Sequence, residues 1–300
     1  MIGLWILTVL FVVLLAVGAV FAAKVVYPKT FAVEETYRIE VEKGYLQPEV
    51  FEKLPKQSVN IRSRYGYDLF GLYFPIEGSK KTVVIAHGIT YTLYGMTKYM
   101  DSYRRRGFNV LLYDHRNHGR SGGNNSTFGY YEKWDLQTVV DWARAQLGED
   151  GVVGVMGESF GAATALQQAA LDDQLAFVVA DCAFSDLEQL LSYRLRQDFG
   201  LPAFPVLWLA RLWMWLLTGM RVREAAPLRV VGQIVAPVLF VHGAADTYIP
   251  PEMSQALYQA KTRGLRQLYL APGADHAMSV VVDPVAYDRV VGAFLEEIGL

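Results

Sequence analysis

Residues 151–171 read GVVGVMGESFGAATALQQAAL, an apolar run of strand length followed by an Ala-rich run of helix length. Between them lies Gly157-Glu158-Ser159-Phe160-Gly161, which has the Gly-x-Ser-x-Gly pattern of a nucleophile elbow. In such an elbow Gly157 and Gly161 let the backbones approach closely, and Ser159 is exposed above the sheet in a strained conformation. The other interpretation is that Ser159 only caps the helix.

Short apolar runs recur along the chain, and a segment of helix length follows each of them. They lack polar–apolar alternation, which is typical of parallel strands covered on both faces. Residues 57–74 predict two further strands joined at Gly66. We therefore expect an α/β fold with a mostly parallel central sheet flanked by helices. The expected parallel strands are 82–86, 108–114, 151–157, 176–181, 237–243 and 267–273, with helices at 94–106, 129–147, 160–171, 251–263 and 284–298.

The composition excludes several classes of protein. Of the 300 residues, 52% are hydrophobic, which is too many for a disordered chain. The 28 basic and 30 acidic side chains leave a net charge of −2, which provides no electrostatic footprint for nucleic acid. Cys182 is the single cysteine, so an intrachain disulfide and a cysteine-rich zinc site are excluded.

The first residues form an uncharged apolar run, Ile2–Ala23, that is long enough to cross a bilayer. A cleaved signal peptide would have a basic start and a shorter apolar core, although Ala22 and Ala23 loosely resemble a cleavage site. A buried globular helix is the third interpretation. We expect residues 1–26 to be a membrane anchor, 27–56 a juxtamembrane segment and 57–300 one catalytic domain.

Basic side chains follow the apolar run, and none precedes it. Lys24, Lys29, Arg38 and Lys43 lie within the next twenty or so residues. The positive-inside rule places such a flank in the cytoplasm, and it gives little weight to nearby acidic residues. We therefore expect a single-pass membrane protein with a cytoplasmic catalytic domain.

A serine nucleophile needs a base, and His276 follows both Ser159 and the last expected strand, as this chain order requires. His87-Gly88-Ile89 follows the strand at 82–86 and is interpreted as an oxyanion loop, with the N–H groups of Ile89 and Phe160 as donors. His242 is expected to be a structural, hydrogen-bonded residue. For His115 and His118, a polar turn is at least as good an interpretation as a functional role, and a metal site is not expected.

A carboxylate must orient and stabilise the imidazole of the base. Asp246 follows the strand at 237–243 and is the leading candidate. Asp181 ends the preceding strand and offers the same kind of position, so it remains an alternative. Asp275 is adjacent to His276 and is too local to fold back onto its neighbour's ring.

The motifs together resemble the α/β-hydrolases, in particular the serine aminopeptidase/lysophospholipase-like branch. They are HGIT (87–90), YDHRNHGRSGG (113–123), GESFG (157–161), HGAADTYIP (242–250) and GADHAMS (273–279). With YEKWDLQTVV (131–140) and YRLRQDFGLPAFP (193–205), they are similar to the membrane-anchored YqkD-type hydrolases of Gram-positive bacteria. The resemblance covers residues 57–300 and implies Ser159 as nucleophile, Asp246 as acid and His276 as base. HGIT replaces the HGGG of many lipases, so their substrate rules do not transfer.

No strand is evident between Asp181 and Ala236, so we expect a helical insertion at about 186–226. Its apolar stretch 203–220 contains Trp208, Trp213 and Trp215. A second transmembrane helix there would separate Ser159 from His276 and is rejected. We expect a cap whose tryptophans line the substrate pocket; a cap that rests on the membrane interface, or packs only on its own domain, remains open.

These residues predict a serine hydrolase that cleaves carboxylic esters through an acyl-enzyme, without metal or cofactor. The expected substrate is a small-molecule or lipid-like ester with a moderately apolar acyl group. An esterase or lysophospholipase is favoured over a peptidase, because no acidic cluster marks a site for a peptide N-terminus. A peptidase or amidase, an acyltransferase, and a membrane-tethered binding module on an inactive hydrolase fold are the alternatives.

Overall fold

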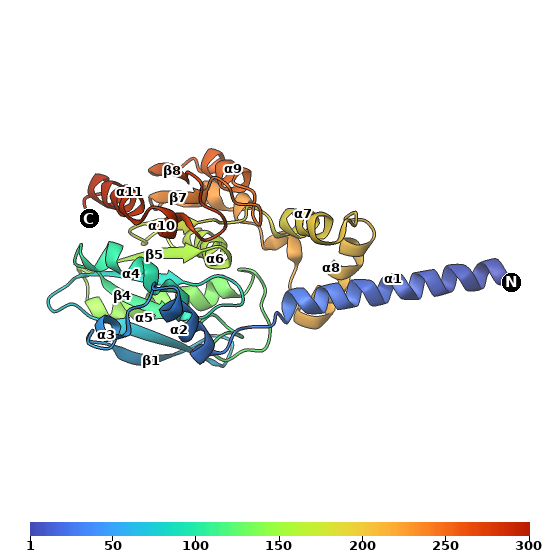
Figure 1. The fold of residues 1–300 in the computed structure, drawn as a ribbon, viewed down its shortest axis with the longest axis horizontal. Helices are drawn as coiled ribbons and strands as arrows, with labels where there is room; N and C mark the ends of the chain where they lie inside the picture. Colours follow the sequence, from blue (N-terminus) through green and yellow to red (C-terminus); the bar gives the residue numbers. More distant parts are fainter.

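The computed structural model describes residues 1–300, and its centre is a single eight-stranded sheet (Figure 1). The strand order is β1-β2-β4-β3-β5-β6-β7-β8. β1 and β2 run antiparallel to their neighbours, and the other six strands are parallel. The strands are β1 (Gln57–Arg62), β2 (Asp68–Phe74), β3 (Lys81–Ala86), β4 (Asn109–Tyr113), β5 (Val152–Glu158), β6 (Val178–Asp181), β7 (Val238–Gly243) and β8 (Arg266–Ala271). The expected sheet is confirmed.

Helices cover both faces of the sheet, which explains the continuous apolar runs of its inner strands. In β4, Leu111 packs into the hydrophobic cluster beneath one face and Leu112 into the cluster beneath the other. Successive strand residues point to opposite faces, so both sets must be apolar. The first face is covered by α5 (Glu132–Leu147), α6 (Phe160–Ala169) and α9 (Glu252–Ala260), and the second by α4 (Thr97–Arg104) and α11 (Pro284–Glu297), with α10 (Ser279–Val282) at its edge.

The segment between the apolar helix and β1 is part of the folded body. It contains α2 (Val33–Glu42) and the short α3 (Pro48–Phe51). The ring of Tyr37 packs edge-on against Tyr94, with 5.1 Å between ring centroids. Glu40 is 3% exposed and accepts a hydrogen bond of 3.0 Å from the Tyr91 hydroxyl. The expected juxtamembrane segment therefore packs beside the loop that follows β3.

The first helix, α1 (Ile2–Val26), projects from the body and is the one helix long and apolar enough to cross a membrane (Figure 1). Its first half is exposed, whereas Ala22 and Val26 are fully buried in a cluster that includes Ala163 of α6. Cleavage after Ala23 would remove Ala22 from this cluster. The last turns of α1 are therefore an integral part of the fold.

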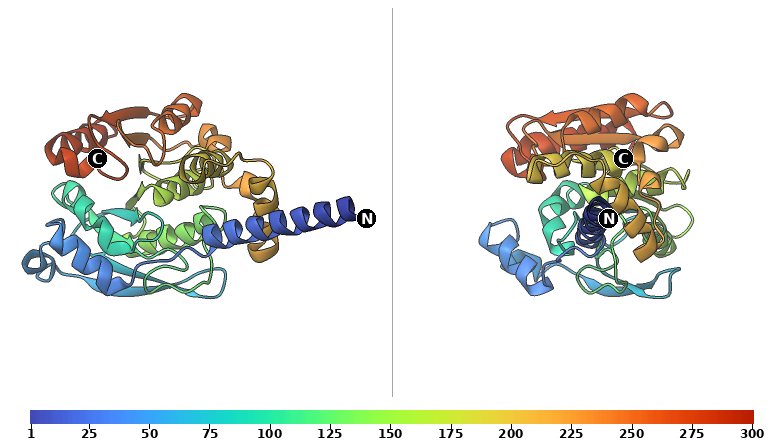
Figure 2. Two further views of the ribbon diagram at one scale, coloured as in Figure 1. Left: turned by 45° about the vertical axis from the view of Figure 1, so that its right-hand side comes forward. Right: turned by 90° about the vertical axis from the view of Figure 1, so that its right-hand side faces the viewer.

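The expected insertion lies between β6 and β7 and consists of α7 (Leu187–Phe199), α8 (Val206–Thr218) and three short 3₁₀ turns at Val222–Glu224, Pro227–Arg229 and Val231–Gln233. α8 runs across α1 in both figures of the fold (Figures 1 and 2). A Cβ on Gly18 would come within 2.8 Å of the Leu209 Cβ, so only glycine permits this close crossing. The Trp213 indole N–H donates to the Leu15 carbonyl at 3.1 Å.

Candidate active site

The turn between β5 and α6 is as sharp as the Gly-x-Ser-x-Gly pattern requires. Ser159 has φ +55° and ψ −114°, a conformation that L residues rarely adopt. A Cβ on Gly157 would collide with the carbonyl oxygen of Gly161, and a Cβ on Gly161 with that of Ala86. The Ser159 N–H donates to the Asp181 carbonyl at 2.7 Å, which holds the strained residue in place.

Three side chains from distant parts of the chain form a continuous hydrogen-bonded line. His276, in the loop after β8, has its Nε2 2.9 Å from the Ser159 Oγ. Its Nδ1 lies 2.7 Å from Oδ2 of Asp246, in the loop after β7. If Nδ1–H donates to the carboxylate, Nε2 keeps its lone pair and is free to accept the serine proton.

Asp246 is buried, with many donors around it. The N–H groups of Tyr248 and Ile249 donate to its Oδ1 at 2.8 and 2.9 Å. Burial alone would raise the pKa of Asp246, but hydrogen bonds from His242 and His276, with those from the backbone, lower it well below its usual range. The carboxylate is therefore ionised at neutral pH and available to stabilise a protonated His276.

His242 is a second imidazole that contacts the Asp246 carboxylate. Its Nε2 faces two acceptors, Oδ2 of Asp246 at 3.1 Å and the Ile249 carbonyl at 2.9 Å, so Nε2 must carry the proton. Its Nδ1 then accepts from the Ser254 hydroxyl at 2.6 Å. This fully buried imidazole is hydrogen-bonded on both nitrogens and fixes the acid loop.

Asp181, the alternative acid, contacts no histidine through a hydrogen bond. Its carboxylate accepts from the Tyr99 hydroxyl at 3.2 Å and from Ser279 at 3.1 Å. Burial, with a smaller contribution from the nearby Glu158 carboxylate, raises the pKa of Asp181 to about 6. Asp275 accepts from the His276 backbone N–H at 2.7 Å and so supports the loop rather than the ring. Of the three carboxylates considered, Asp246 is the one at the imidazole.

The loop after β3 is shaped by neutral histidines. His87 Nε2 accepts from the His115 N–H at 2.9 Å, so its Nδ1–H donates to the Gly88 carbonyl at 2.7 Å. His118 Nε2 accepts from the Thr90 N–H at 3.2 Å. Burial lowers the pKa of all three imidazoles, which therefore remain neutral at physiological pH. Gly88 and Ile89, in this loop, line the same cavity as Ser159, and Phe160 directly follows Ser159 at the start of α6.

His115 and His118 thus belong to the polar turn, where they pack against His87 and Phe160. No group of three or more His, Cys, Asp or Glu side chains is arranged to hold a metal ion.

A cavity of about 330 Å³ opens in front of Ser159 and His276. Sequence reasoning missed most of its lining, which comes from α2, from the loop after β3 and from the loops after β7 and β8. Glu40 carried no signal for the active site in the sequence, because it lies in the segment expected to be juxtamembrane. The lining side chains beyond the oxyanion loop are Glu40, Lys43, Tyr45, Thr90, Tyr91, Lys98, Glu158, Tyr248, Ala277 and Met278.

A second polar group lies at the base of the cavity. Lys98 Nζ is 2.7 Å from Oε2 of Glu158, which also accepts from the Tyr99 hydroxyl at 2.7 Å. Lys98 donates further to the Ala277 carbonyl at 3.0 Å, next to His276. Glu158 is the variable residue of the elbow motif, and a charge at the end of a buried strand was the one available signal for this ion pair.

The expectation that the insertion's tryptophans line the substrate pocket is wrong. Trp208, Trp213 and Trp215 are absent from the cavity of Ser159. The buried face of α8, which includes Ala210 and Met214, packs against α1 and α7. Trp208 and Trp215 consequently lie on its exposed face, and Trp213 is held by α1. It is α7 that reaches the site, since the Arg194 guanidinium donates to the Thr247 carbonyl at 3.3 Å.

Comparison with known proteins agrees with the geometry. Residues 81–226 match the model of the alpha/beta hydrolase fold family. YqkD of Bacillus subtilis is 38% identical over 284 residues, covering 94% of this chain and 93% of its own length. The Pyrococcus furiosus esterase Pf2001 has 25% identity and a TM-score of 0.67 over 84% of this chain and 96% of its own. Est1E from Butyrivibrio proteoclasticus, solved with ferulic acid, has a TM-score of 0.62 at 20% identity over 80% and 98%, and shares the fold. The chain belongs to the α/β-hydrolase family that includes YqkD.

Proposed function

We propose that this protein is a serine hydrolase that cleaves carboxylic esters, with Ser159 as nucleophile, His276 as general base and Asp246 as the acidic residue of the triad, whose carboxylate orients and stabilises His276. The hydrogen-bonded line from Ser159 through His276 to Asp246 carries the proposal. Ser159 attacks the ester carbonyl while His276 takes its proton, and the N–H groups of Ile89 and Phe160 stabilise the oxyanion. The alcohol then leaves with a proton from His276, and water activated by the same imidazole releases the acid.

The test is covalent labelling by a fluorophosphonate probe, which reacts with activated serines. Wild-type protein is expected to be labelled, and Ser159→Ala is expected not to be. Ser58→Ala, on the exposed side of the edge strand β1, is the matched control and should be labelled like wild type. Equal labelling of wild type and Ser159→Ala would refute the assignment.

The cavity supports a short, moderately apolar acyl group. Ile89, Tyr91, Tyr248 and Met278 provide apolar surface near Ser159, and a volume of about 330 Å³ is small for a long chain. A lysophospholipase-like substrate, the alternative, would need room for a longer acyl chain. A chain-length series of p-nitrophenyl and glycerol esters, assayed with and without membranes, tests it: activity that peaks at short acyl chains supports a compact pocket, and a maximum at long chains contradicts it.

Other activities on the same residues are separable by experiment. An acyltransferase would pass the acyl group to an added alcohol in preference to water, and product analysis detects this. A peptidase or amidase would cleave the matching amides, and Glu40 in the cavity provides a carboxylate that favours an amino group there. A binding module on an inactive fold would show neither labelling nor turnover.

We also propose that α1 anchors the catalytic domain in a membrane, on its cytoplasmic side. The length and apolarity of α1 support the anchor, and burial of Ala22 and Val26 favours a retained helix over a cleaved signal. Protease treatment of sealed vesicles of known orientation tests the side: protection of the C-terminal domain when the cytoplasmic face is enclosed is expected, and digestion from outside intact cells would overturn it.

A further inference from the structure

The freely projecting part of α1 is too short to span a bilayer by itself. Residues 2–13 are exposed all round, whereas residues from Leu14 onward begin to pack against the body. Twelve helical residues rise about 18 Å, and the hydrocarbon core of a bilayer is about 30 Å thick. If α1 crosses the membrane, the part beside α8 must also enter it.

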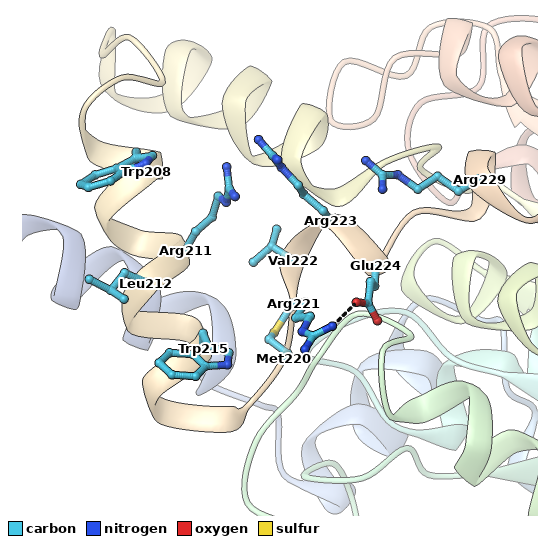
Figure 3. Close-up of a pocket in the computed structure, with 10 residues that line it drawn as sticks. All are labelled: Trp208, Arg211, Leu212, Trp215, Met220, Arg221, Val222, Arg223, Glu224 and Arg229. Carbon is cyan, nitrogen blue, oxygen red and sulfur yellow. Dashed lines mark hydrogen bonds and ion pairs between the residues drawn. The ribbon is translucent and has the colours of Figure 1, made fainter.

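α8 lies across α1 at this level, so it runs along the membrane plane when α1 stands upright (Figures 1 and 2). Trp208, Leu212, Trp215 and Leu216 occupy one face of α8 and are 59%, 44%, 52% and 57% exposed. Figure 3 shows Trp208 and Leu212 on the side of α8 away from the catalytic domain. Tryptophan is favoured at the interface between headgroups and acyl chains.

An apolar groove of about 350 Å³ runs between α1 and the junction of α7 with α8. Val17 and Val20 of α1 face Phe199 and Leu201 across it, and Lys24 lies at its end. Phe199 and Phe204 at this tip of the insertion are 56% and 74% exposed. Exposed apolar surface on this scale, continuous with a membrane helix, indicates contact with lipid.

The exposed face of α8 borders a cavity of about 540 Å³, which Trp208, Leu212 and Trp215 line together with four arginines, namely Arg211, Arg221, Arg223 and Arg229 (Figure 3). Two carboxylates oppose them: Glu188 pairs with Arg211 at 2.7 Å and with Arg223 at 3.2 Å, and Glu224 pairs with Arg221 at 3.2 Å. Arg229 forms no ion pair. The cluster therefore has a positive excess, and guanidinium groups bind phosphate oxygens in bidentate geometry.

We propose that α8 is an interfacial helix, which sinks its Trp208–Leu212–Trp215 face into the membrane that α1 enters, and that the arginine cluster binds the headgroups of anionic phospholipids. The layers match a bilayer surface: apolar and aromatic groups lie outermost, and the arginines lie on the side nearer the catalytic domain. The insertion then acts as a membrane-docking element beside the active site, a role separate from the proposed ester hydrolysis.

The first arm of the test measures depth in the membrane. Full-length protein is reconstituted in phosphatidylcholine nanodiscs containing a fixed fraction of phosphatidylglycerol, with a fluorophore on Leu212→Cys or, as matched control, on Glu297→Cys of α11. The native Cys182 is fully buried and does not compete for labelling. Spin-labelled lipids are expected to quench the fluorophore at 212 several-fold more than at 297. Equal, weak quenching at both positions would overturn the interfacial helix.

The second arm measures headgroup selectivity as the ratio of phosphatidylglycerol to phosphatidylcholine retained by full-length protein in mixed micelles. Arg221→Gln/Arg229→Gln is expected to lower this ratio about tenfold, since each arginine near an anionic surface contributes substantially to binding. Arg221→Lys/Arg229→Lys should keep most of it, and the charge-matched Arg62→Gln/Arg289→Gln should keep all of it. An equal loss in the two Gln pairs would overturn the site, because only net charge would then matter. Competition by inorganic phosphate alone would show a free-anion site and also overturn the proposal.

Discussion

Two buried aspartates at neighbouring strand ends have opposite electrostatic surroundings. Asp181 closes β6, and Asp246 follows β7, its partner in the sheet. Two histidines and two backbone N–H groups surround Asp246, whereas two hydroxyl groups and the nearby Glu158 carboxylate surround Asp181. The pKa of Asp246 is consequently lowered well below its usual range, and burial raises that of Asp181 to about 6.

The difference shows that topological position does not by itself assign a carboxylate to catalysis. Both residues lie at the edge of the sheet where α/β-hydrolases carry their catalytic groups. Only an ionised carboxylate in contact with the imidazole can stabilise positive charge on it. Donors in the loop after β7 keep Asp246 ionised over the whole physiological range, whereas burial with fewer donors leaves the pKa of Asp181 raised to about 6.

The largest expected effect comes from Asp246→Asn, which removes the charge and keeps the shape. The amide leaves His276 without a carboxylate to fix its tautomer, so kcat for ester hydrolysis should fall about 10⁴-fold. Steady-state kinetics on a p-nitrophenyl ester measure the loss, and circular dichroism checks the fold. If Asp181→Asn lost as much activity as Asp246→Asn, the assignment of the two aspartates would be wrong.

A smaller effect is expected from His242→Leu, which removes one donor from Asp246 but leaves His276 in place. The loop loses one hydrogen bond to a charged group, a contribution of roughly 1.5–3 kcal/mol, so kcat should fall about tenfold or somewhat more. A carboxylate with one donor fewer attracts the proton on the His276 imidazole more strongly, so the variant should also lose activity at a higher pH than wild type on acidification. A pH profile of kcat tests this.

Ser254→Ala is the control for that variant, since it removes the partner of the other His242 nitrogen. It should leave the acid limb of the profile close to that of wild type. A His242→Leu enzyme with reduced kcat but an unshifted acid limb would mean that His242 supports only packing.

Arg194→Ala tests whether the insertion, through α7, helps to hold the loop that carries Asp246. The guanidinium lies 4.4 Å from the centre of the Tyr248 ring, which is itself 4.9 Å from the His276 ring. Loss of this contact should loosen the loop and reduce kcat/KM about threefold, in line with an exposed cation–π contact of about 0.5–1 kcal/mol. Arg196→Ala, exposed on the same helix, should have no effect; an equal loss there would point to a general destabilisation of α7.

Much of the fold was predictable because it is local in sequence. Each buried strand is a continuous apolar run, and the elbow at Ser159 follows from glycine spacing and the strand-to-helix change. The order of elements likewise made His276 and Asp246 the leading partners. In contrast, no local pattern predicts that α2 brings Glu40 into the cavity, because that contact joins segments far apart in the chain.

The tryptophans of α8 show a second limit of prediction from the sequence. An aromatic helix in an insertion is compatible with a pocket lining and with a membrane-facing surface. Which face of α8 is buried depends on the crossing at Gly18, and this crossing is a property of the tertiary structure. Sequence patterns therefore identified the helix but assigned its tryptophans to the wrong surface.

The smallest effect on activity, and the sharpest test of the comparison, is expected from Asp181→Asn. Its folded-state pKa of about 6 lies above the unfolded value near 4, so wild type loses stability as pH rises from about 4 to 6. Asn carries no charge and escapes this loss. Relative to wild type, the free energy of unfolding of Asp181→Asn should therefore rise by up to about 3 kcal/mol between pH 4 and pH 7, and kcat should be nearly unchanged.

Thermal unfolding in detergent at the two pH values measures this gain, and Asp288→Asn provides a control of opposite sign. Hydrogen bonds from Arg106 lower the pKa of Asp288, so wild type gains stability from this group as pH rises. The free energy of unfolding of Asp288→Asn should therefore decrease relative to that of wild type over the same range. A difference between Asp181→Asn and wild type that stayed constant from pH 4 to pH 7 would mean that folding does not raise the pKa of Asp181. The contrast between the two strand ends would then rest on hydrogen bonding to His276 alone.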